Sequence, residues 1–290
     1  MYLHCCALFL VQREVSYFYT KLHAKNRVAM KSPEKVITHI VSWLKEYAEK
    51  TQMKGFVIGV SGGIDSAVTS TLCAKTGYPV ICLEMNIHQE ENQVSRAKNH
   101  INWLENQFPN VTHHCLSLTA VFESFKAMLP PTDKHEVEFL SLANTRARLR
   151  MSTLYYFAAL ERYLVAGTGN KVEDFGVGFY TKYGDGGVDL SPIADLMKSD
   201  VFALAKTLGI NNDIQTAAPT DGLWGDDRTD EDQLGATYDE LEWAMRNVST
   251  AASQFSARQK EVMKIYLAFN QQNKHKMDPI PVCEIPSALL

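Results

Sequence analysis

The octet Gly59-Val60-Ser61-Gly62-Gly63-Ile64-Asp65-Ser66 directly follows the apolar run 55–58. An apolar run that ends in glycines before a helical stretch, here 67–76, predicts a buried strand, a tight turn and a helix. Gly62 and Gly63 allow unusual backbone angles and a close approach to a bound group. The start of the following helix offers unpaired N–H groups and a partial positive charge, which together attract anions. We therefore expect a phosphate site at this turn, with Ser61 and Ser66 as further donors.

Asp65 adds a condition, because a carboxylate repels phosphate unless a divalent cation lies between them. Mg²⁺ takes oxygen ligands and shares them with phosphates, so the octet indicates Mg-nucleotide binding. The Walker A and Rossmann loops are excluded by spacing, since G-x-x-x-x-G-K-[ST] and G-x-G-x-x-G are both absent. The octet also fits the G-x-S-x-G elbow of serine hydrolases, with Ser61 as nucleophile. That alternative requires a downstream histidine, and His275 is the only one after His135. We expect the last helix to cover 259–270, which places His275 and Lys276 in a polar tail.

Composition restricts the class of protein. The chain has 290 residues, 46% apolar and 21% charged, which suits one large globular domain or two small ones. A net charge of −4 lacks the basic surface of a nucleic-acid-binding domain. The six cysteines form no C-x-x-C pair, which argues against zinc and a disulfide framework and favours the cytoplasm. No apolar run approaches the roughly 20 residues of a membrane helix, so we expect no membrane partner.

The first 29 residues read differently from the rest. Their apolar stretch lacks the flanking features of a secretory signal. Ser32 is a favourable N-cap and Pro33 suits the first helical position, so the fold is expected to begin near Met30. We expect 1–29 to be a disordered extension or the product of an upstream start, with a functional anchor as the alternative, and 30–290 to form a single domain.

Four apolar runs of strand length alternate with helical stretches. This alternation predicts an α/β fold, a doubly wound and mostly parallel sheet with helices on both faces. In such sheets ligands bind at the carboxyl ends of the strands, so the octet and the Gly167–Asn170 turn should face one crevice. The predicted strands are 56–60, 79–85, 112–116 and 163–166.

Several further side chains have both a plain and a functional interpretation. Arg146 and Arg150 are helical i, i+4 neighbours, with Arg148 facing away; they form a solvated basic face or hold a phosphate or carboxylate. Glu173 is a second Mg²⁺ ligand or a surface helix residue, and Lys198 could simply be solvated. The long acidic segment 218–227, with Trp224, suits a lid or binding loop.

These segments, taken in order, resemble the NAD synthetase family, and the octet resembles the loop of the wider ATP pyrophosphatase (PP-loop) superfamily. The resemblance extends over about 30–276, and its most specific part is the K-Y-G-D-G-G-x-D stretch 182–189. It implies a ligase of the ammonia-dependent form, without a glutaminase domain. The reaction implied is amidation of deamido-NAD by ammonia with ATP, giving NAD, AMP and pyrophosphate through an NAD-adenylate. Two Mg²⁺ ions and a homodimer are also implied.

The resemblance assigns roles to individual residues. The octet binds ATP together with Thr168, Lys198 and Thr220, of which Asp65, Lys198 and Thr220 are catalytic. Asp65 and Glu173 hold Mg²⁺. Deamido-NAD is expected to contact Arg148, Lys182, Asp189, His275 and Lys276. The sequence departs from the family pattern at three places, Gln233, residues 225–227 and Met277. A non-catalytic ATP sensor remains an alternative.

Overall fold

The computed structural model describes residues 30–89, 91–220 and 229–289. Its centre is a parallel sheet with the strand order β3-β2-β1-β4. The predicted α/β fold is thereby confirmed. Because only two residues of the fourth strand pair with β1, β4 is shorter than expected. The strands are β1 (Phe56–Gly59), β2 (Val80–Asn86), β3 (Val111–Ser117) and β4 (Leu164–Val165).

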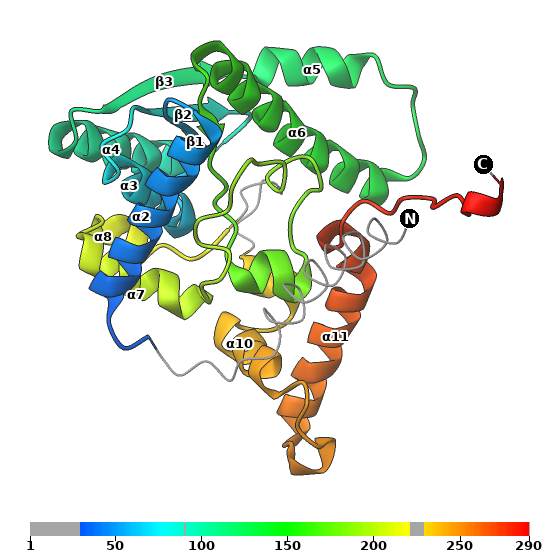
Figure 1. The fold of residues 1–290 in the computed structure, drawn as a ribbon. Coiled ribbons are helices and arrows are strands. Elements are labelled where there is room, and N and C mark those ends of the chain that lie inside the picture. The colour runs from blue at the N-terminus through cyan, green and yellow to red at the C-terminus, as the bar shows by residue number, and fades with distance from the viewer. Residues whose placement is uncertain (1–29, 90, 221–228, 290) are drawn as a thin grey trace.

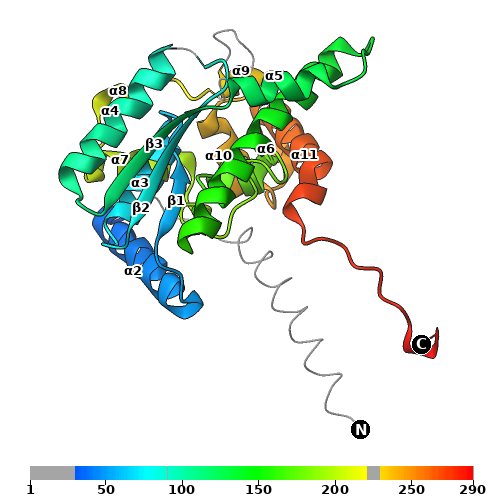
Figure 2. The same ribbon diagram turned by 90° about the horizontal axis from the view of Figure 1, so that it is seen from above.

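Helices cover both faces of the sheet, as predicted (Figure 2). Alternate strand residues point to opposite faces: Phe56 and Ile58 pack into the larger core, whereas Val57 packs into the core beneath α6. The helices of the larger core are α2 (Pro33–Thr51), α3 (Ile64–Ala74), α4 (Glu91–Gln107) and α7 (Lys198–Leu208). The other face carries α6 (His135–Glu161), preceded by α5 (Thr119–Ala127).

A second group of helices lies beside the sheet (Figure 1). Its core contains Val172, Leu241 and Val262, each at most 1% exposed. Its members are the π-helix η1 (Lys171–Val177), α9 (Asp230–Leu234), α10 (Tyr238–Asn247) and α11 (Ala257–Met277). Shorter elements complete the fold: α8 (Asn212–Gln215), η2 (Ala252–Gln254) and η3 (Ser287–Leu289).

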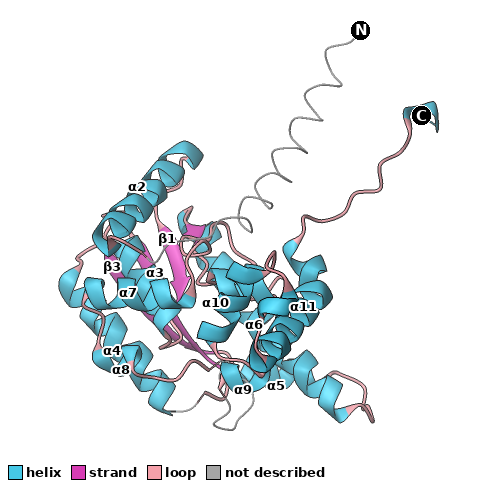
Figure 3. Ribbon diagram, turned by 90° about the horizontal axis from the view of Figure 1, so that it is seen from below, coloured by secondary structure: helices cyan, strands magenta, loops and turns pink. Residues whose placement is uncertain are grey.

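The C-terminal helix differs from the expectation that His275 and Lys276 lie in a polar tail. That expectation was wrong, because α11 continues through Met277 and includes both residues in its last turn. Polar side chains hold the last turns of this helix against η1, since Asn270 and Asn273 donate 2.8 Å hydrogen bonds to carbonyls of η1. Beyond α11 the chain runs out from the body in an extended form (Figure 3).

Other expectations concern the chain's start and the possible lid. Pro33 occupies the start of α2 and Ser32 is its N-cap residue, but the Ser32 hydroxyl donates to the Glu34 carboxylate instead of capping the helix. Residues 1–29 and the part of the lid that contains Trp224 lie outside the described residues. Among the described helices, none is long and apolar enough to cross a membrane.

Candidate nucleotide-binding site

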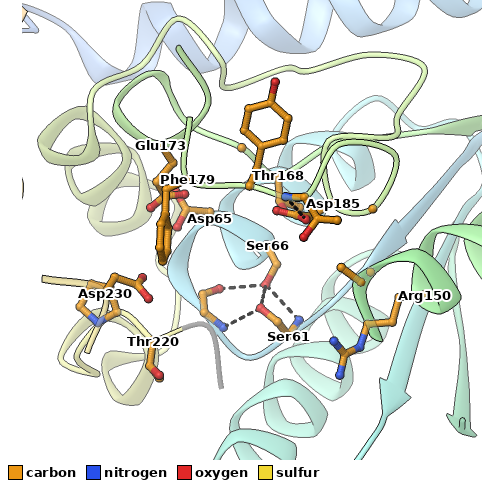
Figure 4. A pocket seen from close by; sticks show the side chains of 18 of the residues that line it. Ser61, Asp65, Ser66, Arg150, Thr168, Glu173, Phe179, Asp185, Thr220 and Asp230 are labelled. Atoms are coloured by element: carbon orange, nitrogen blue, oxygen red, sulfur yellow. Dashed lines mark hydrogen bonds between the residues drawn. The ribbon is translucent and has the colours of Figure 1, made fainter. Parts of the chain in front are cut away.

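A cavity of about 740 Å³ opens at the carboxyl ends of β1 and β4, where the strand order predicts a ligand crevice. This volume suits a ligand of nucleotide size. The cavity brings together segments that are far apart in the sequence (Figure 4). Its predicted members are the whole octet 59–66, Thr168, Glu173, Lys198, Thr220 and Lys276.

The two glycines of the loop have different physical roles. Gly62 has φ +82°, and a Cβ there would lie 2.6 Å from the carbonyl oxygen of Gln93. Gly63 has φ −90°, an ordinary value, and its Cβ would approach the Ser61 hydroxyl no closer than 3.4 Å. The expectation of an unusual backbone is therefore confirmed for Gly62 and wrong for Gly63, because the N-cap of α3 has ordinary extended geometry.

Hydroxyl groups hold the loop in shape (Figure 4). The Ser66 hydroxyl donates to the Gly63 carbonyl at 2.9 Å and lies 3.2 Å from the Ser61 hydroxyl. The Ser66 oxygen also accepts the Ser61 N–H at 3.2 Å, and the Ser61 oxygen accepts the Gly63 N–H at 3.3 Å. The loop is thus ordered at the N-terminus of α3, where the helix dipole favours an anion.

Lys198 connects the loop to the second predicted cation ligand. Its ammonium group donates to Asp65 at 2.7 Å and to Glu173 at 2.9 Å. The Lys198 side chain is only 4% exposed, so it is not the solvated residue of the plain interpretation. Two carboxylates and one ammonium leave the cluster with a net negative charge. That charge favours an additional cation.

The protonation of this cluster follows from burial and charge. Burial raises the pKa of Asp65, and this effect outweighs the opposing attraction of Lys198. For Glu173 the balance is reversed: burial opposes ionisation, but Lys198 and a hydrogen bond from Tyr238 lower its pKa. Burial likewise opposes the charge of Lys198, yet the two carboxylates raise its pKa above the usual value. Lys198 therefore stays charged.

Glu173 lies in a π-helix, a rare form that often occurs at functional sites. Asn170 caps its start, and its side-chain oxygen Oδ1 accepts the N–H groups of Val172 and Glu173. The Asn170 amide donates in turn to Asp65 at 3.0 Å. One side chain therefore fixes the segment that carries Glu173 and orients the other carboxylate. Glu173 is not the surface residue of the plain interpretation.

The donor set fits Mg²⁺. Asp65 and Glu173 place carboxylate oxygens around one point, and the Lys198 ammonium marks that point with a positive charge. Within the described ranges no cluster of three or more His, Cys, Asp or Glu side chains could hold a metal alone. Mg²⁺ commonly takes one or two carboxylates and completes its shell with phosphate and water oxygens. Two protein ligands are enough for a cation that arrives with a nucleotide.

The opposite side of the cavity contains Arg150 (Figure 4). Arg150 donates to the Met85 carbonyl at 3.0 Å and to Gln89 at 3.1 Å, and burial lowers its pKa to about 10. The Arg146 guanidinium lies 4.5 Å from the centre of the Phe122 ring. The plain interpretation of a solvated basic face is therefore wrong for this pair, because Arg150 turns inward between the helix and β2.

Most of the residues expected to bind deamido-NAD lie outside the cavity lining. The Arg148 guanidinium is 3.4 Å from the Lys182 carbonyl oxygen, and the Lys182 ammonium donates to the His275 carbonyl at 2.9 Å. Asp189 accepts hydrogen bonds from Tyr155 and from the Val165 N–H. These four roles remain predictions. Lys276 does line the cavity, where its ammonium donates to the carbonyls of Gly178 and Tyr180.

Sequence reasoning missed three polar side chains of the site: Asn170, Asp174 and Tyr238. An asparagine before a helical stretch is an N-cap signal that could have identified Asn170. Asp174 lines the cavity. Its pKa is raised well above the usual value, mainly by burial and next by repulsion from Glu173. Neither Asp174 nor Tyr238 lies in a motif, so only the packing of distant helices reveals them.

The hydrolase alternative receives no support from this geometry. The catalytic triad of the G-x-S-x-G elbow uses a downstream histidine as the base for its serine. In the described part of the chain, the cavity lining contains no histidine, and the His275 ring lies against the Gln272 carbonyl.

Comparisons with known proteins identify the family of this chain. The sequence model of the NAD synthase family matches residues 36–279. The chain belongs to the NAD synthase family. It is 39% identical to the NH(3)-dependent NAD(+) synthetase of Carboxydothermus hydrogenoformans, over 70% of this chain and 81% of that one.

Two solved structures also resemble the structure of this chain. The NMN synthetase of Francisella tularensis has a TM-score of 0.75 at 31% identity, over 89% of this chain and all of that one. The NH3-dependent NAD synthetase of Campylobacter jejuni has a TM-score of 0.69 at 25% identity, over 87% and 100% of the two chains. The shared fold therefore occurs in proteins named for two related products.

Proposed function

We propose that this protein is an ammonia-dependent NAD synthetase, which amidates the nicotinate carboxylate of deamido-NAD with ATP. The supporting observation is that the octet, Asp65, Glu173 and Lys198 meet in one cavity of a NAD synthase family member. We propose deamido-NAD, ATP and ammonia as its substrates and the cytoplasm as its location. The cysteines of the described residues, all unpaired, are compatible with a reducing compartment.

The proposed chemistry has two steps. A nicotinate oxygen attacks the α-phosphorus of ATP, the bond to the bridging oxygen breaks, and pyrophosphate leaves. Ammonia then attacks the activated carbonyl carbon, AMP leaves, and the nitrogen loses a proton to give the amide. The first step converts a carboxylate, which is a poor electrophile, into an adenylate with a good leaving group.

Each part of the cavity has a task in this scheme. The N-terminus of α3 and the loop hydroxyls bind the pyrophosphate, and Thr168 contacts ATP. Lys198 and Thr220 act nearest the α-phosphate. Asp65 and Glu173 would hold Mg²⁺, which would supply positive charge to stabilise the leaving group. Two such ions are proposed, although the chain's own carboxylates define one position.

We also propose that the protein works as a homodimer and that residues 30–290 act as one domain. Helix α7 contacts both α3 and α10, which joins the two cores. Large apolar side chains remain exposed on α5 and α6, and exposed apolar patches mark contact surfaces. A second copy would cover them and could complete the deamido-NAD site near Arg148 and Lys182. These side chains are Val121 and Phe125 on α5, Met128 directly after it, and Val137, Leu140, Tyr156 and Leu160 on α6.

The experiment that tests the activity is NAD formation from deamido-NAD, ATP and Mg²⁺, with ammonium compared against glutamine. Turnover with ammonium alone is expected, and Asp65→Ala should abolish it. Asp213→Ala, which changes an exposed carboxylate of α8, serves as the matched control. ATP binding with no AMP release in either nitrogen source would favour the non-catalytic sensor instead. Light scattering in the same buffer tests the dimer.

A second candidate is amidation of the mononucleotide, nicotinate mononucleotide, to NMN. It is favoured by the likeness to the Francisella enzyme, whose name states that product. The position of Arg148, Lys182 and His275 outside the cavity lining is compatible with it, because a mononucleotide needs no contacts for a second nucleotide half. Comparing kcat/KM for the two acids decides between them. We expect deamido-NAD to be preferred.

A further inference from the structure

Tyr238 makes the shortest contact to the cation-binding carboxylates. Its hydroxyl lies 2.6 Å from Glu173 and 3.2 Å from Asp230. A phenol hydroxyl has a single proton to donate, and the shorter contact identifies Glu173 as its acceptor. The side chain comes from α10, a helix that contributes no predicted site residue.

The backbone of Tyr238 is fixed independently of the cavity. It is the first residue of α10, after a Thr237 cap whose hydroxyl accepts the Glu240 N–H. The Tyr238 N–H donates to Glu231 at 2.8 Å, which satisfies a group that has no partner inside the helix. With 6% exposure, the ring is packed in the second core. The hydroxyl therefore reaches Glu173 from a rigid base.

Tyr238 also contacts Lys198, whose ammonium neutralises Glu173 in this structure. The Lys198 ammonium lies 4.6 Å from the centre of the Tyr238 ring, in cation–π geometry. Both hydrogen bonds, from Lys198 and from Tyr238, end on the same oxygen of Glu173, Oε1. The carboxylate can therefore turn its other oxygen toward a cation without losing the Tyr238 bond.

We propose that Tyr238 is a positioning residue, which holds Glu173 in place for the divalent cation when the phosphates of ATP draw Lys198 away. This inference rests on the proposed Mg-ATP function of the cavity. Of the two side chains that donate to Oε1 in the described part of the chain, Lys198 and Tyr238, the tyrosine stays when the lysine is drawn away. Hydrogen-bond partners of metal ligands typically change metal affinity or activity 10–100-fold when removed.

The test compares the full chain with Tyr238→Phe and with Tyr266→Phe as the matched control. Both variants remove one hydroxyl from a buried tyrosine of the same core, and Tyr266 is 4% exposed. Mn²⁺ binding is measured by electron paramagnetic resonance in the presence of a non-hydrolysable ATP analogue. We expect binding about 10–100-fold weaker in Tyr238→Phe and close to wild type in Tyr266→Phe. The Mg²⁺ concentration for half-maximal turnover should rise by the same factor.

Further measurements separate positioning from stability and from the proposed reaction. In a Glu173→Gln background, Tyr238→Phe should weaken Mn²⁺ binding no further; additive losses would overturn the proposal, as would wild-type affinity in the single variant. Thermal melts should show both phenylalanine variants folded. If the wild-type protein binds Mn²⁺ with the analogue but forms no amide, the proposed function fails, while the Mn²⁺ comparison still decides the role of Tyr238.

Discussion

Replacing Lys198 by methionine would test the charge balance of the site. The substitution keeps the apolar stem but removes the ammonium between Asp65 and Glu173, 2.7 and 2.9 Å away. Oxygens bonded to one nitrogen lie within about 6 Å of each other, where two like charges repel by about 3 kcal/mol at an effective dielectric constant of 20. Their buried charges would also lose their partner, and breaking a buried pair typically costs about 3–5 kcal/mol.

We therefore expect Lys198→Met to lower the free energy of unfolding by about 3–5 kcal/mol at pH 7. Mg²⁺ should restore part of it, since a cation at 100 times its dissociation constant stabilises by about 2.7 kcal/mol. The loss should also shrink as the pH falls, because without the ammonium both carboxylate pKa values rise and protonation removes the repulsion. Urea unfolding, with and without Mg²⁺ and at pH 7 and 4, measures all three effects.

Lys171→Met provides the control for this experiment. Lys171 is also buried, with a side chain 9% exposed, and its ammonium lies 2.9 Å from Asp195, whose side chain is 67% exposed. Water can solvate that exposed carboxylate when the Lys171 ammonium is removed, so we expect a cost of about 1 kcal/mol or less, insensitive to Mg²⁺. A Lys198→Met cost as small as the control's, or equal Mg²⁺ stabilisation of both variants, would refute the reasoning.

Three further outcomes are expected. Gly62→Ala should abolish ATP binding, measured by calorimetry, and lower the free energy of unfolding, because its Cβ would lie 2.6 Å from the Gln93 carbonyl oxygen. Gly77→Ala is the control: Gly77 has φ +79° but nothing within 4 Å of an added Cβ, so we expect only backbone strain of about 1–2 kcal/mol. Asp65→Ala should reduce AMP release at least about 100-fold, the usual order of effect for a group that stabilises transition-state charge. Burial lowers the pKa of His100 to about 4, below its unfolded value, so stability should fall by about 2 kcal/mol from pH 7 to 5 in urea titrations, and His100→Asn should remove this slope.

The elements around the octet could be predicted from the sequence because their signals are local. Apolar period and glycine position predict strand and turn, and strand–helix alternation predicts a parallel sheet. The carboxyl-end rule then brings Thr168 to the same crevice as the octet without any knowledge of packing. The C-terminal helix was predicted too short, because the asparagines that extend it act through hydrogen bonds to η1, about 95 residues earlier in the chain.

The remaining part of the site depends on packing between elements, which no local pattern encodes. Lys198 looks like an exposed residue at a helix start until α7 packs against α3, and Tyr238 looks like an ordinary core aromatic until α10 meets η1. Even Glu173 acquires its direction from the cap that Asn170 forms. The position of these residues on a helix face did not predict where their side chains point, because a partner from another segment orients each one.

That dependence explains why the charged groups of the site come from three separate segments. A phosphate cradle needs only the loop and one helix, so it can be encoded in eight consecutive residues. A cation site beside it needs carboxylates that lie close together although they repel each other. Without a metal ion, a positive side chain must offset that repulsion. Lys198 supplies that charge here, with its ammonium 2.7 Å from Asp65 and 2.9 Å from Glu173. Under the proposed function, the same ammonium would turn to the α-phosphate once Mg²⁺ took its place beside the two carboxylates, so cation binding and activation of the substrate would be coupled through Lys198.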